Sequence, residues 1–233
     1  MLLWLTDYLA QYVAAFQVFQ YLTFRTMVSA GTAMFLSLIF GPILISKLST
    51  HQIGEVVRED GPSSHQIKAG TPTMGGALIL IVMLATTILW GDLSSRYVRI
   101  ALCVTLAFGA IGWIDDYIKV SRSGAGHGLS AKWKYLFQSV FGIAAAVVLY
   151  RTASSDTDTA LIMPFVKAIS IPLGAFGFIL LGYLMIVGMS NAVNLTDGLD
   201  GLAILPTVMV GAALGVIAYL VGHIEFATYL QIP

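Results

Sequence analysis

Long apolar stretches, separated by short polar ones, constrain this sequence more than any other feature. A helix needs roughly 20 mostly apolar residues to cross a bilayer, and six stretches come close to that length. They cover residues 23–46, 73–90, 98–116, 133–151, 171–189 and 201–222. Only 10% of the 233 residues are charged, against about 25% in soluble domains. The sequence therefore predicts an all-α, polytopic integral membrane protein, with residues 1–233 forming a single transmembrane domain of about six helices.

The first twenty-one residues differ from these stretches. Polar side chains interrupt their apolar run, and the first basic residue is Arg25, so the segment lacks the basic start of a signal peptide. Its aromatic residues are of the kind enriched at membrane interfaces: Trp4, Tyr8, Tyr12 and Tyr21. We expect a short helix at the membrane interface.

Lysines and arginines are distributed unevenly between the polar connections. Seven fall on one side of the predicted membrane and five on the other. By the positive-inside rule, the loops at about 47–72 and 117–132 face the cytoplasm and the N-terminus lies outside. Residues 190–200 then also emerge on the cytoplasmic side. The zero net charge gives no indication of nucleic-acid binding, and the single cysteine, Cys103, excludes a disulfide within the chain.

Residues of chemical interest concentrate in these three cytoplasmic loops. The first holds Arg58, Asp60, His65 and Lys68, and the second begins with Asp115 and Asp116. Adjacent aspartates at a helix end often mark only where the chain enters water. Carboxylates at the helix centre of a membrane span are unfavourable, however, by about 2.5–3.5 kcal/mol each on insertion scales. A divalent cation relieves this, and Mg²⁺ typically takes one or two carboxylates plus substrate phosphates.

The third loop, NAVNLTDGLD (191–200), spaces Asn194, Asp197 and Asp200 three residues apart. If this segment is helical, the three side chains fall near one face, and Gly198 and Gly201 let a ligand approach closely. Alternatively, the glycines only end one helix and begin the next. Simple explanations also exist for other residues: Lys132 and Lys134 suit a membrane boundary, His65 suits a solvated loop, and Thr71 or Thr73 suits a helix cap.

Together these motifs make the sequence resemble the phospho-N-acetylmuramoyl-pentapeptide transferases, within the polyprenyl-phosphate N-acetylhexosamine-1-phosphate transferase superfamily. The resemblance rests on RxDGPxxHxxKxGTPTMGG (58–76), DDY (115–117), NAVNLTDGLDGLA (191–203) and YLTFR (21–25). It implies a Mg²⁺-dependent enzyme of the bacterial inner membrane, with its site facing the cytoplasm. The implied reaction joins UDP-N-acetylmuramoyl-pentapeptide and undecaprenyl phosphate into lipid I and UMP, and a homodimer is left open.

The resemblance also assigns residues. Asp115 and Asp116 match the family's catalytic and metal-binding pair, and Asn194, Asp197 and Asp200 match its nucleotide-binding region. Lys68, Thr73 and Lys134 match positions near the cleft, and His65 lies in the matched loop motif. The family has about ten transmembrane helices, with a third aspartate and a histidine-rich loop farther along. We therefore expect this chain to be the N-terminal portion, which inserts in the membrane without making lipid I alone.

Other functions fit part of the pattern. The related GlcNAc-1-phosphate transferases share the last two motifs in looser form. A transporter also carries intramembrane carboxylates, but the acidic motifs here gather at one face and no inverted repeat is visible. An inactive fragment is the third alternative. If the chain is a transferase, metal positioning should matter more than proton removal, because a phosphate monoester is already mostly dianionic at pH 7. Lys68 or Lys134 would then offset the repulsion between two anionic substrates.

Overall fold

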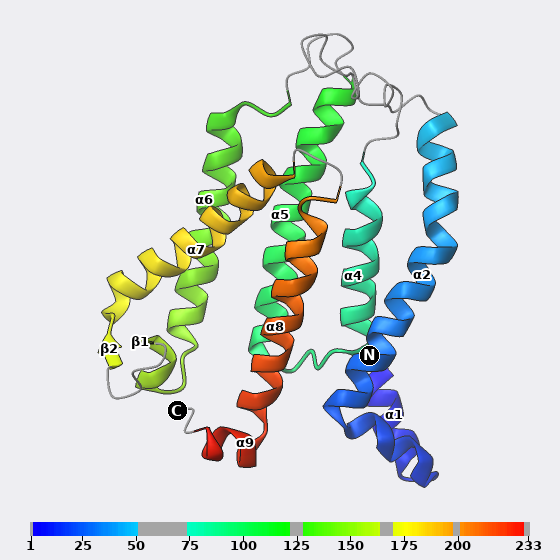
Figure 1. Cartoon of the computed structure of the whole chain (residues 1–233), viewed down its shortest axis with the longest axis vertical. Coiled ribbons are helices and arrows are strands. Elements are labelled where there is room, and N and C mark those ends of the chain that lie inside the picture. The colour runs from blue at the N-terminus through cyan, green and yellow to red at the C-terminus, as the bar shows by residue number, and fades with distance from the viewer. Residues whose placement is uncertain (1, 51–73, 122–127, 164–169, 198–200, 231–233) are drawn as a thin grey trace. The chain divides into compact units, whose positions relative to one another are not determined.

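The computed structural model describes residues 2–50, 74–121, 128–163, 170–197 and 201–230, most of which are helical (Figure 1). Among them, five helices are long and apolar enough to cross a membrane. These are α2 (Leu22–Thr50), α5 (Arg96–Ser121), α6 (Ala131–Arg151), α7 (Gly174–Thr196) and α8 (Ile204–Gly222). The expected all-α, multi-pass membrane fold is confirmed.

The helix ends differ from those expected. α4 (Gly76–Trp90) has 15 residues, which is about 22 Å of helix against a hydrocarbon core of about 30 Å. α5 continues to Ser121 and α7 to Thr196, so the expected loops 117–132 and 190–200 both begin as helix. Hydropathy predicts where an apolar span ends. The helix itself can continue beyond that point through polar residues, as both of these helices do. The aspartate pair consequently lies inside α5 instead of at its end.

The N-terminal segment forms the expected short helix, α1 (Leu2–Ala10), followed by the 3₁₀ helix η1 (Ala14–Gln20). Trp4 stacks on Tyr8 with ring centroids 6.3 Å apart, and Tyr8 meets Tyr12 edge-on at 5.4 Å. All three aromatic side chains are exposed. The placement of α1 at a membrane interface stays a prediction.

The chain divides into two compact units, residues 1–141 and 142–233. In the first, α4 packs between α2 and α5 (Figure 1). Trp90 Nε1 donates to Thr32 Oγ1 of α2 at 3.2 Å, and its ring stacks on Phe19 at 5.6 Å. On the opposite side Leu80 lies against Gly109, where an added Cβ would come within 2.6 Å of Leu80 Cδ2. The glycine thus lets α4 approach α5 closely.

In the second unit, small residues bring the later part of α6 against α7. A Cβ at Gly142 would lie 2.8 Å from Val187 Cγ2, and one at Gly182 would lie 3.2 Å from Ala146 Cβ. Small residues at such crossings are typical of membrane helices. The remaining elements complete the unit: η2 (Asp156–Thr159), the antiparallel pair β1 (Ala160–Ile162) and β2 (Ser170–Pro172), α8, and α9 (Ile224–Tyr229).

The helices are built to contact lipid. Large apolar side chains are exposed along all of them, and no residue of α8 is buried. Several threonine hydroxyls donate to the carbonyl four residues earlier, as Thr32 does to Val28 at 2.7 Å and Thr207 does to Ala203 at 2.7 Å. A hydroxyl satisfied within its own helix needs no water.

Candidate active site

The last turns of α5 bring two carboxylates and one ammonium group together. Residues three and four positions apart share one side of a helix, and Lys119 follows Asp116 and Asp115 at those spacings. Its Nζ lies 2.9 Å from Asp115 Oδ2 and 3.0 Å from Asp116 Oδ1. One lysine therefore bridges both members of the aspartate pair.

Asp115 is enclosed on the side facing the α5–α6 connection, and its side chain is only 9% exposed. Its Oδ1 accepts the backbone N–H of Leu129 at 2.7 Å, and Lys134 Nζ of α6 lies 3.4 Å from its Oδ2. A Cβ added at Gly128 would overlap Asp115 Oδ1. This carboxylate is therefore held by three donors from three segments of the chain.

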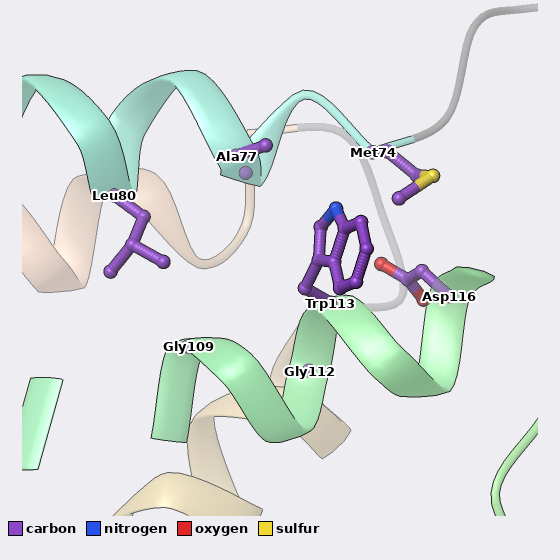
Figure 2. A pocket seen from close by; sticks show the side chains of 8 residues that line it. Met74, Ala77, Leu80, Gly109, Gly112, Trp113 and Asp116 are labelled. Carbon is purple, nitrogen blue, oxygen red and sulfur yellow. The ribbon is translucent and has the colours of Figure 1, made fainter. Parts of the chain in front are cut away.

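Asp116 faces elsewhere. Its side chain is 41% exposed and lies at the edge of a cavity of about 230 Å³ between α4 and α5 (Figure 2). No described residue is bonded to its Oδ2, because the ion pair with Lys119 uses Oδ1. The cavity is lined by Met74, Gly76, Ala77 and Leu80 on one side and by Gly109, Gly112, Trp113 and Asp116 on the other.

The sequence shows why a cavity forms here. Gly109 and Gly112 lie three residues apart on α5 and bring no side chains to its wall, and an added Cβ at Gly112 would meet open space. Trp113 closes the end nearest Asp116 (Figure 2) and stacks on Tyr117, with ring centroids 5.4 Å apart. Met74 has φ of 72°, a strained backbone conformation of the kind that often occurs at functional sites.

The two aspartates differ in how well they fit a metal ion. Within the described parts of the chain, no three His, Cys, Asp or Glu residues cluster, so a site made wholly of protein carboxylates is not formed there. The oxygens of Asp115 already accept an N–H and two ammonium groups. Asp116 keeps an oxygen available, which suits Mg²⁺ because this ion is commonly held by one or two carboxylates plus substrate phosphates.

The structure places the other predicted site residues unequally. Lys134 joins the aspartates, whereas His65, Lys68, Thr73 and Asp200 lie outside the described residues. In the second unit, Asn194 is in the last turn of α7. Asp197 caps the C-terminal end of that helix, its N–H still donating to Val193 O at 3.1 Å. α7 ends at Thr196, so Asp197 does not continue the helical face of Asn194, and the position of Asp200 near them, outside the described residues, stays a prediction.

Gly201, shortly before α8, has a backbone conformation that favours glycine. Its φ is 79°, and an added Cβ would meet nothing within 4 Å. Backbone conformation therefore favours glycine at this position, and the close approach of a ligand to it stays a prediction. A glycine in the left-handed region commonly separates two helices.

Lys119 is the residue that sequence reasoning missed as part of the site. Lys119 contributed only to the difference in positive charge between the two sides of the predicted membrane, because the predicted span ended at residue 116. The signal was present in the sequence: a lysine three and four positions after two aspartates meets both of them if the helix continues.

Comparison with known protein families gives two matches. The profile described as Glycosyl transferase family 4 matches residues 98–232, more than half of the chain. The Phospho-N-acetylmuramoyl-pentapeptide-transferase signature 1 matches residues 68–80. Residues 74–80 of that signature supply the α4 wall of the cavity, and the α5 wall belongs to the family match.

Proposed function

The chain belongs to glycosyl transferase family 4, and on that premise we propose that it moves a sugar 1-phosphate from a nucleotide donor to a polyprenyl phosphate in the membrane. The signature at residues 68–80 supports a finer proposal. The donor is UDP-N-acetylmuramoyl-pentapeptide, the acceptor undecaprenyl phosphate, and the products are lipid I and UMP. This is the first membrane step of peptidoglycan synthesis, which we place at the cytoplasmic side of the bacterial inner membrane.

One observation carries this proposal. Two segments that match independently, the signature and the longer family match, meet at one cavity with the exposed carboxylate of Asp116 at its edge (Figure 2). The cavity lies between two apolar helices, where a soluble phosphorylated donor and a lipid-bound acceptor have to meet. This position suits transfer to a lipid better than a pathway through the membrane, which would place carboxylates near the bilayer midplane.

The proposed reaction exchanges one pyrophosphate for another. An oxygen of the acceptor phosphate bonds to the β-phosphorus of the donor, and the bond from that phosphorus to the oxygen of UMP breaks. The acceptor is mostly dianionic at neutral pH, because the second pKa of a phosphate monoester is about 6. The work left to the protein is to position two anions and to neutralise their charge.

We assign different parts of this reaction to different residues. Asp116 is the ligand available for Mg²⁺, which when bound would neutralise charge on the donor pyrophosphate. Lys119 and Lys134 add positive charge beside it. From the matched motifs, we assign donor binding to the remaining predicted residues: Asn194, Asp197, Asp200, Lys68, Thr73 and His65.

A transfer assay with two donors tests this proposal. The full-length protein in membranes is given undecaprenyl phosphate with labelled UDP-N-acetylmuramoyl-pentapeptide or with labelled UDP-GlcNAc, and labelled lipid is extracted and counted. We expect lipid product from the first donor only, less of it in Asp116→Asn at limiting Mg²⁺, and normal product in the control Asp156→Asn, at an exposed aspartate of η2. Product from UDP-GlcNAc alone would assign the other branch of the superfamily, and no product from either donor would contradict the proposal.

A further inference from the structure

The surroundings of Asp115 are unlike those of a carboxylate that takes up a proton or a metal ion. Its Oδ1 accepts a 2.7 Å hydrogen bond from Leu129 N–H, and Gly128 lies directly against the same oxygen. Its Oδ2 is shared by the ammonium groups of Lys119 and Lys134. A base or metal ligand needs an open oxygen, and here it is the neighbouring Asp116 that offers one.

The same geometry suits Asp115 to a different role, which is to hold the two lysines in place. Two ammonium groups that contact one carboxylate oxygen are held close together, and their mutual repulsion is offset by the negative charge between them. Two lysines around one buried carboxylate sum to one positive charge, which the carboxylate of Asp116, also in contact with Lys119, offsets until a cation neutralises it. Lys119, at 45% exposure, is accessible to a ligand and also contacts Asp116 at the cavity. Ammonium groups are point charges well suited to phosphate oxygens.

We propose that Asp115 is a positioning residue that holds Lys119 and Lys134 together as a phosphate-binding site. We further propose that position 128 must be glycine so that Asp115 can do so. This inference rests on the proposed function and gives the two aspartates different roles in it. The ligand is a phosphate group of either substrate, and separate KM values for donor and acceptor identify which one.

The sequence alone does not indicate that Gly128 belongs to this proposed phosphate-binding site. An added Cβ would overlap Asp115 Oδ1 and come within 2.8 Å of Lys119 Cε. Its φ lies outside the left-handed region, so backbone conformation permits alanine there. The steric conflict is with the carboxylate and the lysine that make up the site.

A mutant cycle tests the coupling. Asp115→Asn should lower kcat/KM on the order of a hundredfold and raise the KM of the substrate whose phosphate is bound. The Mg²⁺ concentration for half-maximal activity should stay unchanged. In a Lys119→Gln/Lys134→Gln background, adding Asp115→Asn should change kcat/KM less than about threefold, because a residue that acts through others loses its effect once they are removed. Additive losses, or a raised Mg²⁺ requirement in Asp115→Asn, would overturn the inference.

Gly128→Ala provides an independent check, with Gly31→Ala as the matched control, because an added Cβ at Gly31 of α2 meets nothing within 4 Å. The first should lower kcat/KM as Asp115→Asn does, without adding to it, and the control should keep normal activity. If the Asp115 variants fail to accumulate, Lys119→Gln alone must raise the same KM and Lys119→Arg must partly restore it. Full-length wild-type protein without transfer would contradict the proposed function itself, whereas active wild type with normal Gly128→Ala would contradict only this inference.

Discussion

Asp115 and Asp116 are neighbours in sequence, yet their side chains are 9% and 41% exposed and point to different surroundings. Successive residues on a helix project about 100° apart, so the two carboxylates share Lys119 but otherwise have different neighbours. One points to the α5–α6 connection and the other to the α4–α5 cavity. Substitutions at the two positions should therefore have effects that differ in kind.

Asp116→Asn should change the response to the metal ion. Removing the carboxylate that we assign to Mg²⁺ lowers the affinity for the ion, so we expect the half-saturating Mg²⁺ concentration to rise roughly tenfold or more. The measurement is a Mg²⁺ titration of UMP release by the full-length protein in detergent. Asp156→Asn is the control. An unchanged Mg²⁺ requirement in Asp116→Asn would remove this residue from the metal site.

Filling the cavity should stop turnover without unfolding the protein. Gly112 lines the cavity, and a side chain there would start in open space, so Gly112→Leu should occupy the volume where substrates meet. We expect transfer to fall on the order of a hundredfold, with unchanged behaviour in size-exclusion chromatography. Gly31→Leu, also directed into open space, should stay active. Normal kinetics in Gly112→Leu would show that substrates do not use this cavity.

Asn194 and Asp197 should act on donor binding. Hydrogen bonds to a charged group contribute about 1.5–3 kcal/mol each, so alanine at either position should weaken binding of the UDP-linked donor roughly tenfold or more. Isothermal titration calorimetry with the purified variants measures this directly, and Asp156→Ala is the matched control. Donor affinity equal to that of the wild type in both variants would reject the assignment.

The orientation of the helices can be tested with single cysteines. Cys103 is the chain's single cysteine, so a Cys103→Ser background accepts new ones at Ser130, which directly precedes α6, and at Thr157 in η2. We expect a membrane-impermeant maleimide to label Thr157→Cys in intact cells and Ser130→Cys only after the membrane is opened. The reverse pattern would invert the predicted topology.

The fold was predictable from the sequence to the extent that it depends on hydropathy. Apolar length alone gave the positions of the long helices, because any span in lipid has to satisfy its own backbone hydrogen bonds. It did not give the helix ends, since α5 and α7 continue through polar residues such as Lys119 and Asn194. Nor did it show that the α4 helix is too short to cross the hydrocarbon core on its own.

The candidate site was predictable only in its residue types. The aspartates and Lys134 were expected near one another, and the structure joins Asp115 to Lys134 at 3.4 Å. The enclosure of Asp115 and the role of Gly128 depend on where the α5–α6 connection returns. That is set by tertiary packing between residues 14 positions apart, which hydropathy and local spacing do not encode.

The most direct test of sugar 1-phosphate transfer traces the phosphorus atom of the donor's β-phosphate. The full-length protein is given donor labelled with ³²P at the β-phosphate, together with undecaprenyl phosphate and Mg²⁺, and the label is traced after extraction. Transfer of a sugar 1-phosphate predicts that the label enters the lipid fraction while one unlabelled UMP is released for each lipid formed. Label that remains in released UDP, with unlabelled sugar on the lipid, would show transfer of the sugar alone and would contradict the account.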